Sequence, residues 1–578
     1  MASAGSGARR AVVWFRNDLR LRDNAAVAEA AAKVKGGEVD SVVPLYVFDP
    51  RSFKASPWGN VKTGPYSKAG TKRLTADSRV RHTASRGRAQ FLLESVAALK
   101  GSLKALGSDL LVAVGRPEDV IPGLLGDGGQ LVLTQEEVTS EELSVDAKVA
   151  RAVKPRGGRL VKLWGSSLYH RDDLPFKEGC GDVPDVFTPF KEKAERMGKV
   201  RKELPTPKPG DLPLPQGLPD ALTSTLPTWE QLPFPVGSRP APPARHPSGV
   251  LDFKGGEAVA LARLKYYLWD SDLVADYFNI RNGMLGGDYS TKLAPWLSAG
   301  CISPRTIYHE IKRYEAQRGS NKSTYWVIFE LTWRDYFKFF ALKHGNSIFF
   351  ETGTSGLPLT WTKDPELFER WAQGRTGMPL VDANMRELAA SGWMSNRGRQ
   401  NVASYLVLDL GVDWRRGGDW FEHHLLDYDV ASNWGNWVSA AGLTGGRINH
   451  FNITKQSKDY DPDGEYIRAW VPELKNVPAP RIHEPWLMSK DEQERYGVQI
   501  GKDYPNPIPS SRFGRPHGGG GGGGGRGSGG GGRYGGGGGG GRGSFVRHGG
   551  GGGGGGGGRG GRGGGGRQSR RSEFDRFG

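Results

Sequence analysis

Ala11-Val-Val-Trp-Phe15 decides the fold of the first part of the chain, because this apolar run is followed by a polar loop and an alanine-rich segment from Asn24. The pattern is typical of a buried strand that leads into a helix. The alternation continues, with strands predicted at 41–48, 109–114 and 131–134 and a helix at 90–106. Such alternation favours a parallel sheet, so we predict an α/β, Rossmann-like domain over 11–200. No GxGxxG follows the first strand, which argues against a nicotinamide-binding domain.

The second half of the chain differs in composition and periodicity. Proline recurs every few residues from Arg201 to Pro247 and hydrophobic periodicity is lost, which indicates an interdomain linker over 201–250. Residues 251–509 then show long helical patterns without alternating strands, at 256–270, 324–343 and 399–410. We therefore predict an all-helical domain after the linker.

The last segment, 510–578, consists mostly of glycine and arginine. From Gly518 onward it holds 38 of the 88 glycines, ten arginines and two acids. This composition cannot bury a core, so we predict a disordered Gly/Arg-rich tail, and a flexible N-terminus over 1–10. The arginines, together with Tyr534, Phe545 and Phe574, suit loose binding to single-stranded DNA or RNA, and a solvated linker without a ligand is the equal alternative.

Charge and cysteine content narrow the class of protein. The net charge is +17, of which the segment from Gly518 onward contributes +8 and the rest of the chain +9. A basic remainder favours an anionic partner such as nucleic acid, and a basic enzyme without one is the alternative. No apolar run approaches the ~20 residues of a membrane span, and neither a secretory signal, a disulfide framework nor a zinc site is indicated. We expect a soluble intracellular protein of the cytoplasm, nucleus, chloroplast or mitochondrion.

Tryptophan is concentrated in the predicted helical domain, where 13 of the 17 lie between Trp269 and Trp486. A single tryptophan is nearly always a core residue, because its large apolar surface stabilises the fold when buried. Indole can also be oxidised by one electron. A series of indoles is therefore suited to carrying electrons between a buried cofactor and the surface.

Asp288-Tyr-Ser-Thr-Lys-Leu293 precedes a predicted helix that ends near Gly300. Ser290 or Thr291 is predicted to cap that helix, and together with Lys292 and the helix N–H groups it would form a cradle for a diphosphate. A well-capped helix without a ligand is the alternative.

A second polar cluster lies among the apolar helices, where unpartnered polar groups would cost several kcal/mol. It is either an internal ion pair, for instance Arg399 with Asp427, or the wall that faces the polar edge of a flavin, with Asn433 beside N5. The residues are Asn396, Arg399, Asp427, Asp429 and Asn433.

Ordered motifs along 11–509 resemble those of the photolyase and cryptochrome flavoproteins. The matching stretches are Trp14-Phe-Arg-Asn-Asp-Leu-Arg20, Arg281-Asn-Gly283, Tyr289-Ser-Thr-Lys-Leu293, Glu330-Leu-Thr-Trp-Arg-Asp335, Gly377-Met-Pro-Leu-Val-Asp-Ala-Asn384, Gly392-Trp-Met-Ser-Asn-Arg-Gly-Arg399 and Asn433-Trp-Gly-Asn-Trp437. The resemblance is closest to the DASH-type cryptochromes, through Leu168-Tyr-His170, Asp173-Leu-Pro-Phe176, Pro184-Asp-Val-Phe187 and Gln456-Ser-Lys-Asp-Tyr-Asp461.

The resemblance implies FAD in the helical domain. The residues that would bind it are Tyr277, Ser290, Thr291, Lys292 and Leu293 around the phosphates and ribitol, with Arg334, Asn396, Arg399, Asp427, Asp429 and Asn433 around the rest. Trp437, Trp414 and Trp361 match the photoreduction triad, from proximal to distal. A second, antenna chromophore, 5,10-methenyltetrahydrofolate, is implied between the two domains, with Glu137 as a contact.

The resemblance also implies a nucleic-acid site. Glu330, Trp333 and Asn433 would be catalytic: Trp333 would stack on an unpaired base, and a protonated Glu330 would donate a hydrogen bond to a thymine carbonyl. Arg281 and Arg397 would lie near the DNA backbone. Ser439 stands where relatives carry a second aromatic, which predicts a weaker hold on the lesion and puts repair of paired DNA in doubt.

The implied activity is that of a monomeric deoxyribodipyrimidine photolyase, a lyase. Blue light would drive electron transfer from reduced FAD to split cyclobutane pyrimidine dimers, preferably in single-stranded DNA, where a dimer leaves the stack at least cost. The alternative is a blue-light photoreceptor, a nucleic-acid-binding signalling cryptochrome without significant repair, which Ser439 and the tail favour.

Overall fold

The computed structural model describes residues 9–53, 86–126, 130–216, 218, 225–235, 239, 241–446 and 448–509, and all of them belong to one unit of the chain. The predicted tail over 510–578 and most of the predicted N-terminal segment lie outside the described residues. The domain boundaries proposed from the sequence stay predictions. Among the described residues, none of the helices is long and apolar enough to cross a membrane.

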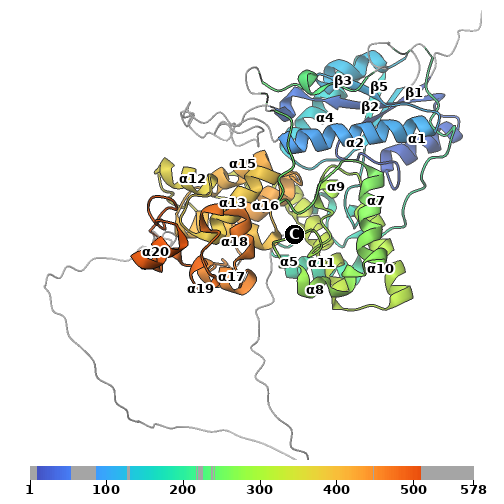
Figure 1. Ribbon diagram of the computed structural model, residues 1–578. Helices are drawn as coiled ribbons and strands as arrows, with labels where there is room; N and C mark the ends of the chain where they lie inside the picture. Colours follow the sequence, from blue (N-terminus) through green and yellow to red (C-terminus); the bar gives the residue numbers. More distant parts are fainter. Residues whose placement is uncertain are drawn as a thin grey trace, which may run out of the picture. The chain divides into compact units, whose positions relative to one another are not determined.

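The first domain is built on a five-stranded parallel sheet (Figure 1). Its order is β3-β2-β1-β4-β5, and its strands are β1 (Arg10–Phe15), β2 (Ser41–Phe48), β3 (Leu111–Val114), β4 (Gln130–Gln135) and β5 (Gly158–Leu163). The parallel α/β architecture predicted from the sequence is confirmed. β5 was not predicted, because it lies at the sheet edge and its residues are only partly buried, so it lacks an apolar run.

Helices cover both faces of this sheet, as the alternation of side chains along β1 requires. Val13 and Phe15 pack into the larger core, together with residues of α1 (Ala25–Lys35) and α2 (Arg86–Ala105). Val12 and Trp14 pack into a smaller core with α4 (Ser140–Val153). Asn24 caps α1, since its side chain accepts hydrogen bonds from two backbone N–H groups of the first turn. The domain also contains α3 (Pro117–Val120) and α5 (Phe187–Met197).

The second domain is helical, and no strand occurs among its described residues. Its helices are α7 (Glu257–Lys265), α8 (Tyr277–Ile280), α9 (Ala294–Ser298), α10 (Pro304–Arg318), α11 (Lys322–His344), α12 (Pro365–Ala372), α13 (Pro379–Ser391), α14 (Asn396–Ser404), α15 (Trp414–His424), α16 (Val430–Ala440), α17 (Ile453–Tyr460), α18 (Glu465–Trp470), α19 (Ala479–Ile482) and α20 (Lys490–Tyr496). The predicted helices at 256–270 and 399–410 each end in a π-helical turn, at Tyr266–Asp270 and Tyr405–Asp409.

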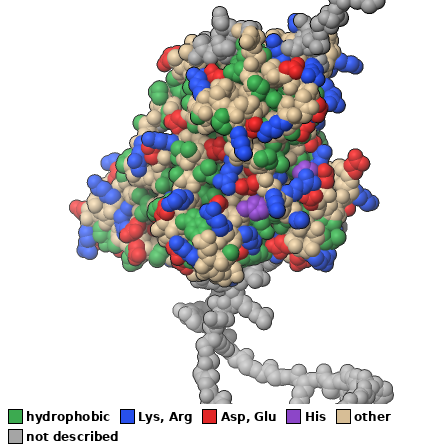
Figure 2. Space-filling model, turned by 90° about the vertical axis from the view of Figure 1, so that its right-hand side faces the viewer, with side chains coloured by type: hydrophobic (Ala, Val, Ile, Leu, Met, Phe, Trp, Pro, Cys, Tyr) green, Lys and Arg blue, Asp and Glu red, His purple; other side chains and the backbone are tan. Residues whose placement is uncertain are grey.

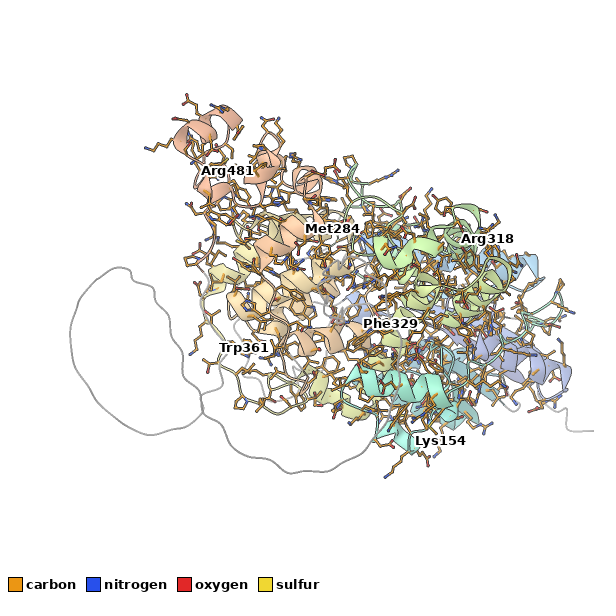
Figure 3. All side chains as sticks on the ribbon, turned by 90° about the horizontal axis from the view of Figure 1, so that it is seen from below. Lys154, Met284, Arg318, Phe329, Trp361 and Arg481 are labelled. Atoms are coloured by element: carbon orange, nitrogen blue, oxygen red, sulfur yellow. The ribbon has the colours of Figure 1, made fainter. Side chains whose placement is uncertain are left out.

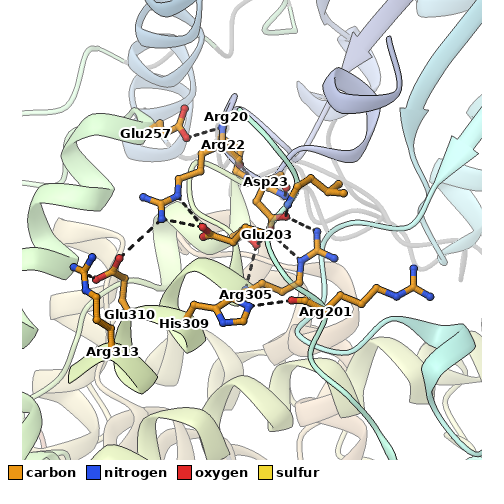
Figure 4. Close-up of polar contacts among 12 residues, drawn as sticks. Arg20, Arg22, Asp23, Arg201, Glu203, Glu257, Arg305, His309, Glu310 and Arg313 are labelled. Atoms are coloured by element: carbon orange, nitrogen blue, oxygen red, sulfur yellow. Dashed lines mark hydrogen bonds and ion pairs between the residues drawn. The ribbon is translucent and has the colours of Figure 1, made fainter. Parts of the chain in front are cut away.

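Buried polar contacts join the two domains (Figure 4). Arg305 of α10 donates hydrogen bonds of 2.7 and 2.9 Å to both carboxylate oxygens of Asp23, and neither side chain is more than 5% exposed. Glu257 of α7 accepts hydrogen bonds from the backbone N–H groups of Leu21 and Arg22. Removal of one partner from such a buried pair leaves an uncompensated charge, so these contacts fix the first strand's loop against the helical domain.

Gly300 permits the closest approach of the two domains. A Cβ at this position would lie 2.0 Å from the backbone oxygen of Asn17, and the residue adopts φ +71°. Both facts require glycine there. The surface face in Figure 2 shows acidic and basic side chains interspersed, so the net positive charge is not gathered into one uninterrupted patch on that face.

Candidate functional site

A cavity in the helical domain gathers most of the predicted cofactor residues. Its wall comes from the loop before α9 and from α8, α11, α14, α15 and α16. The predicted residues that line it are Tyr277, Ser290, Thr291, Lys292, Leu293, Arg334, Asn396, Arg399, Asp427, Asp429 and Asn433. Residues far apart in the sequence thus face one space, and the set combines cations, hydroxyls, amides and aromatic rings.

Lys292 is the most unusual residue of this wall. It is 1% exposed, has φ +59°, and its Nζ lies 2.8 Å from the ring centroid of Tyr289 and 3.1 Å from Oγ of Ser290. Burial lowers the pKa of its amine well below the usual value. The nearby Glu387 accepts a 2.6 Å hydrogen bond from the Tyr466 hydroxyl, and burial raises its pKa to about 8. A buried cation held in strained backbone and facing a cavity fits an anionic ligand group such as a diphosphate.

The predicted N-cap at Ser290 or Thr291 is wrong. The helix begins at Ala294, Leu293 is the N-cap residue, and no side chain caps it. Ser290 instead accepts the hydrogen bond from Lys292, and the backbone oxygens of Ser290 and Thr291 accept hydrogen bonds from Arg263. The helix is five residues long, so its dipole adds little, and the hydroxyls and Lys292 carry the anion-binding chemistry of this loop.

Arg399 and Asp427 form an ion pair and also line the cavity, so the two alternatives for these residues are compatible. The guanidinium donates to both oxygens of Asp427, at 2.8 and 3.0 Å, so the ion pair expected as an alternative exists. The same two side chains line the cavity. Asp429 caps α16 by accepting a 2.8 Å hydrogen bond from the Ser432 N–H. The acids are thus held in place by protein partners before any ligand binds.

Two asparagines present amide groups to the cavity. The side-chain nitrogen of Asn433 donates a 3.0 Å hydrogen bond to the backbone oxygen of Gly418, which leaves its Oδ1 as the acceptor for a ligand. Oδ1 of Asn396 is buried and has no hydrogen-bond partner among the described residues. An orphaned buried acceptor costs about 1–3 kcal/mol, and an N–H group of a flavin would satisfy it. The donor set therefore fits FAD.

Several lining residues were not singled out from the sequence. Tyr289, Trp393 and Asn436 lie within the quoted motifs, and Phe421 lies on α15. Trp393 packs at 5.2 Å on Phe253 and lies 5.3 Å from Nζ of Lys292. Position inside the motifs was the signal that could have found the first three, whereas nothing local marks Phe421.

The predicted lesion residues do not all meet. Glu330 of α11 lines the cavity, and its carboxylate lies 4.0 Å from the guanidinium of Arg281, which also lines it. Trp333 does not: it is 4% exposed, stacks on Phe187 at 3.5 Å, and also contacts the rings of Phe329, Tyr336 and Phe337. Phe187 of α5 covers the Trp333 ring, so Trp333 does not face the cavity in this structure, and its contact with a base stays a prediction.

Arg397 is likewise a core residue. It is 4% exposed, donates to Gln400 at 2.6 Å and Asn282 at 3.0 Å, and lies 4.4 Å above the Tyr460 ring. The structure places Arg397 among protein partners, and its contact with the DNA backbone stays a prediction. Ser439 is partly exposed on α16 and is not among the residues that line the cavity.

The predicted triad lies on neighbouring segments. Trp437 lines the cavity and is 1% exposed, Trp414 is fully buried, and Trp361 is partly exposed. The Trp437 ring packs over Gly417, where a Cβ would meet it at 2.3 Å, one turn along α15 from Trp414. Thr362, the residue after Trp361, donates a backbone hydrogen bond of 2.8 Å to the carbonyl oxygen of Gly411, which lies just before α15. Trp437 thus faces the cavity and Trp361 reaches the surface, and the passage of electrons along the three indoles stays a prediction.

A second cavity lies at the junction of the α/β and helical domains. Glu137 lines it, as do Arg88 and Lys338. Burial lowers the pKa of Lys338, and the charge of Glu137 acts in the opposite direction. The two cations, with the carboxylates of Glu137, Glu142 and Asp429, suit a ligand with carboxylate and N–H groups. The residues that line both cavities are Ser298, Tyr428 and Asp429.

Comparison with known proteins gives consistent matches. The family described as DNA photolyase matches residues 11–209, and the FAD binding domain of DNA photolyase matches residues 326–515. A cryptochrome DASH, chloroplastic/mitochondrial, from Ostreococcus tauri is 53% identical over 87% of this chain and 90% of that protein. A cryptochrome DASH from Gloeobacter violaceus is 46% identical over 86% of this chain and 92% of that protein.

Solved structures agree. The Synechocystis sp. PCC6803 cryptochrome is similar with a TM-score of 0.76 and 44% identity, covering 87% of this chain and 96% of that chain. A class III photolyase from Agrobacterium tumefaciens has a TM-score of 0.68 at 27% identity, covering 88% of this chain and 96% of that chain. The chain therefore belongs to the photolyase and cryptochrome family, in its DASH branch. It carries the family's FAD-binding domain, and its role is light-dependent, in DNA repair or in photoreception.

Proposed function

We propose that the chain splits cyclobutane pyrimidine dimers in single-stranded DNA under blue light. The observation that carries this proposal is that Glu330 and Asn433 line one cavity, so a group suited to a pyrimidine carbonyl and a group suited to a flavin face the same space. Bound FAD would supply the photoexcited electron. The protein's part is to hold the dimer beside it, exclude water and donate a hydrogen bond from Glu330.

The preference for single strands follows from what holds the dimer. Trp333 is covered by Phe187, and position 439 is a serine, so few aromatic surfaces compensate for unstacking a base from a duplex. Unstacking costs a few kcal/mol in paired DNA and less in a single strand. The dimer in duplex DNA is therefore expected to bind more weakly.

The test is dimer repair under blue light by the reduced holoprotein, with a thymine-dimer oligonucleotide as single strand and as duplex. Glu330→Gln keeps a hydrogen-bond donor and should retain repair, whereas Glu330→Ala should lose most of it. Repair that is equal on both substrates contradicts the strand preference. Equal repair by the alanine variant contradicts the role of Glu330.

Photoreception is the second candidate function, and the coverage of Trp333 by Phe187 favours it, because it removes a base-stacking surface. If the holoprotein photoreduces FAD but repairs neither substrate, this candidate replaces the first. Light-dependent change in nucleic-acid affinity is its direct readout. The Gly/Arg-rich tail, which would bind RNA or DNA, lies outside the described residues. The affinity of the full-length protein is therefore compared with that of a variant from which the tail is deleted.

We further propose that the second cavity holds 5,10-methenyltetrahydrofolate as an antenna, with Glu137 contacting its pterin N–H groups. A carboxylate in a cavity that adjoins the flavin cavity supports this assignment. Glu137→Gln should weaken folate binding about tenfold, the usual effect of a charge-assisted hydrogen bond. Near-ultraviolet absorbance after reconstitution and gel filtration gives the bound fraction, and unchanged binding contradicts the role of Glu137.

A further inference from the structure

Three partly exposed aromatic side chains form a ridge on the helical domain, which we call the aromatic ridge: Phe278 of α8, and Trp326 and Phe329 of α11. Phe278 meets Trp326 edge-on at 4.8 Å, and Trp326 stacks on Phe329 at 4.5 Å. Phe329 is labelled in Figure 3. The indole Nε1 of Trp326 is buried and has no hydrogen-bond partner among the described residues. The ridge therefore offers partly exposed ring surface, while its inner side packs on the core through the edge-on contact of Phe329 with Phe187 at 5.2 Å.

Cations flank the aromatic ridge. Nζ of the exposed Lys322 lies 3.6 Å from the Phe278 ring centroid and 5.7 Å from that of Trp326. Within the described part of the chain, no carboxylate pairs with Lys322. Nζ of Lys191 lies 5.8 Å from the Phe329 ring and 3.9 Å from Glu195, which reduces its net effect. An exposed ammonium beside rings matches a ligand that combines phosphates with bases.

The aromatic ridge is continuous with the flavin cavity. The Arg281 guanidinium lies 4.9 Å from the Trp326 ring and 4.0 Å from the carboxylate of Glu330, and both Arg281 and Glu330 line the cavity. Val327, next to Trp326 in α11, lines it as well. A strand with one residue in the cavity would therefore leave it over the ridge.

We propose that the aromatic ridge is a second subsite for single-stranded DNA, which stacks the unpaired bases beside the dimer while Lys322 contacts a phosphate. Every base has a π-face, so such stacking is independent of sequence. Bases in a duplex are already stacked and paired and cannot use it. The inference rests on the proposed function, and it explains a single-strand preference without a second aromatic at position 439.

The test uses the full-length, FAD-bound protein in the dark and fluorescence anisotropy. The probes are a single strand with a central thymine dimer and five nucleotides on each side, and the thymine-dimer dinucleotide as competitor. We expect the long strand to bind more tightly than the dinucleotide, and Trp326→Leu to weaken the long strand about 5- to 100-fold. Lys322→Gln should lower the slope of log affinity against log salt by about 0.7, the value for one phosphate contact on a single strand.

The matched control is Lys154→Gln, an exposed lysine that directly follows α4 in the α/β domain. It should leave the salt slope unchanged. If Trp326→Leu lowers the melting temperature, its weaker binding can result from a less stable fold. The salt slope of Lys322→Gln, an exposed side chain, then decides whether the subsite exists. A salt slope that Lys322→Gln does not change, or a long strand that binds no better than the dinucleotide, overturns the subsite. Loss of strand binding in the variants with no repair by the wild type would instead overturn the proposed function and leave the subsite standing.

Discussion

Replacing Lys292 by methionine should change cofactor affinity and apoprotein stability in opposite directions. Methionine keeps the aliphatic length and removes the charge. Truncating one partner of a buried, hydrogen-bonded charge pair costs about 2–5 kcal/mol, so Kd for FAD should rise about 30- to 4000-fold. The ammonium is 1% exposed, and Ser290 Oγ is its hydrogen-bond acceptor at 3.1 Å. FAD-free protein should gain about 1 kcal/mol, because methionine removes a poorly compensated buried cation.

The pH dependence gives an independent measure of this effect. Burial lowers the pKa of Lys292 in the folded protein, so the unfolded chain binds this proton more tightly. The free energy of unfolding of the apoprotein should therefore rise with pH above the lowered pKa of the folded amine, and the rise should end as the unfolded amine titrates near its usual pKa of about 10.4. Lys292→Met should flatten this rise. Denaturant unfolding of the apoprotein from pH 6 to pH 9, followed by circular dichroism, measures the slope.

Lys100→Met is the matched control. Lys100 is a buried lysine of the α/β domain, but its Nζ is paired with Asp109 at 2.7 Å and with the backbone oxygen of Leu110 at 2.6 Å. Its loss should lower apoprotein stability and leave FAD affinity unchanged. Fluorescence titration of released flavin measures the affinity. A Lys292→Met variant that binds FAD like the wild type refutes the assignment of Lys292 to the diphosphate.

Three further predictions concern electron transfer and stability. Trp437→Phe should abolish photoreduction of oxidised FAD, measured by absorbance under blue light. The control Trp434→Phe, which removes an indole that donates a hydrogen bond to Glu422, should not abolish it. Equal photoreduction rates in the two variants would contradict the triad. Burial raises the pKa of Asp335 to about 6, so its proton is bound more tightly in the folded protein, and this stabilisation is present below about pH 4 and is lost as pH rises through 6. Asp335→Asn should remove that dependence, which melting temperatures between pH 4 and pH 7 would reveal. Arg305→Met, which leaves the carboxylate of Asp23 buried, should cost about 3–5 kcal/mol, whereas Arg313→Met at an exposed pair should cost less than about 1 kcal/mol; similar denaturation midpoints would refute the difference.

Local patterns predicted most of the fold. The apolar run at Ala11–Phe15 and the helical period at 324–343 appear as β1 and α11, because a strand inside a parallel sheet and a buried helix each impose their own spacing of apolar residues. β5 lacked such a run because its residues are only partly buried. The predicted N-cap at Ser290 is wrong because its hydroxyl lies against Lys292 instead of the helix. The conformation of this loop depends on hydrogen bonds from Arg263, which is distant in the sequence.

The sequence by itself determined the family, the order of the two domains and a set of candidate side chains for the cofactor, because these depend on residue types in ordered motifs. Only the tertiary structure decided which of them face it. Trp333 and Glu330 lie three residues apart on α11, yet Phe187 covers the first while the second lines the cavity. Burial and orientation depend on what another segment of the chain places against a residue, and no local spacing records that contact.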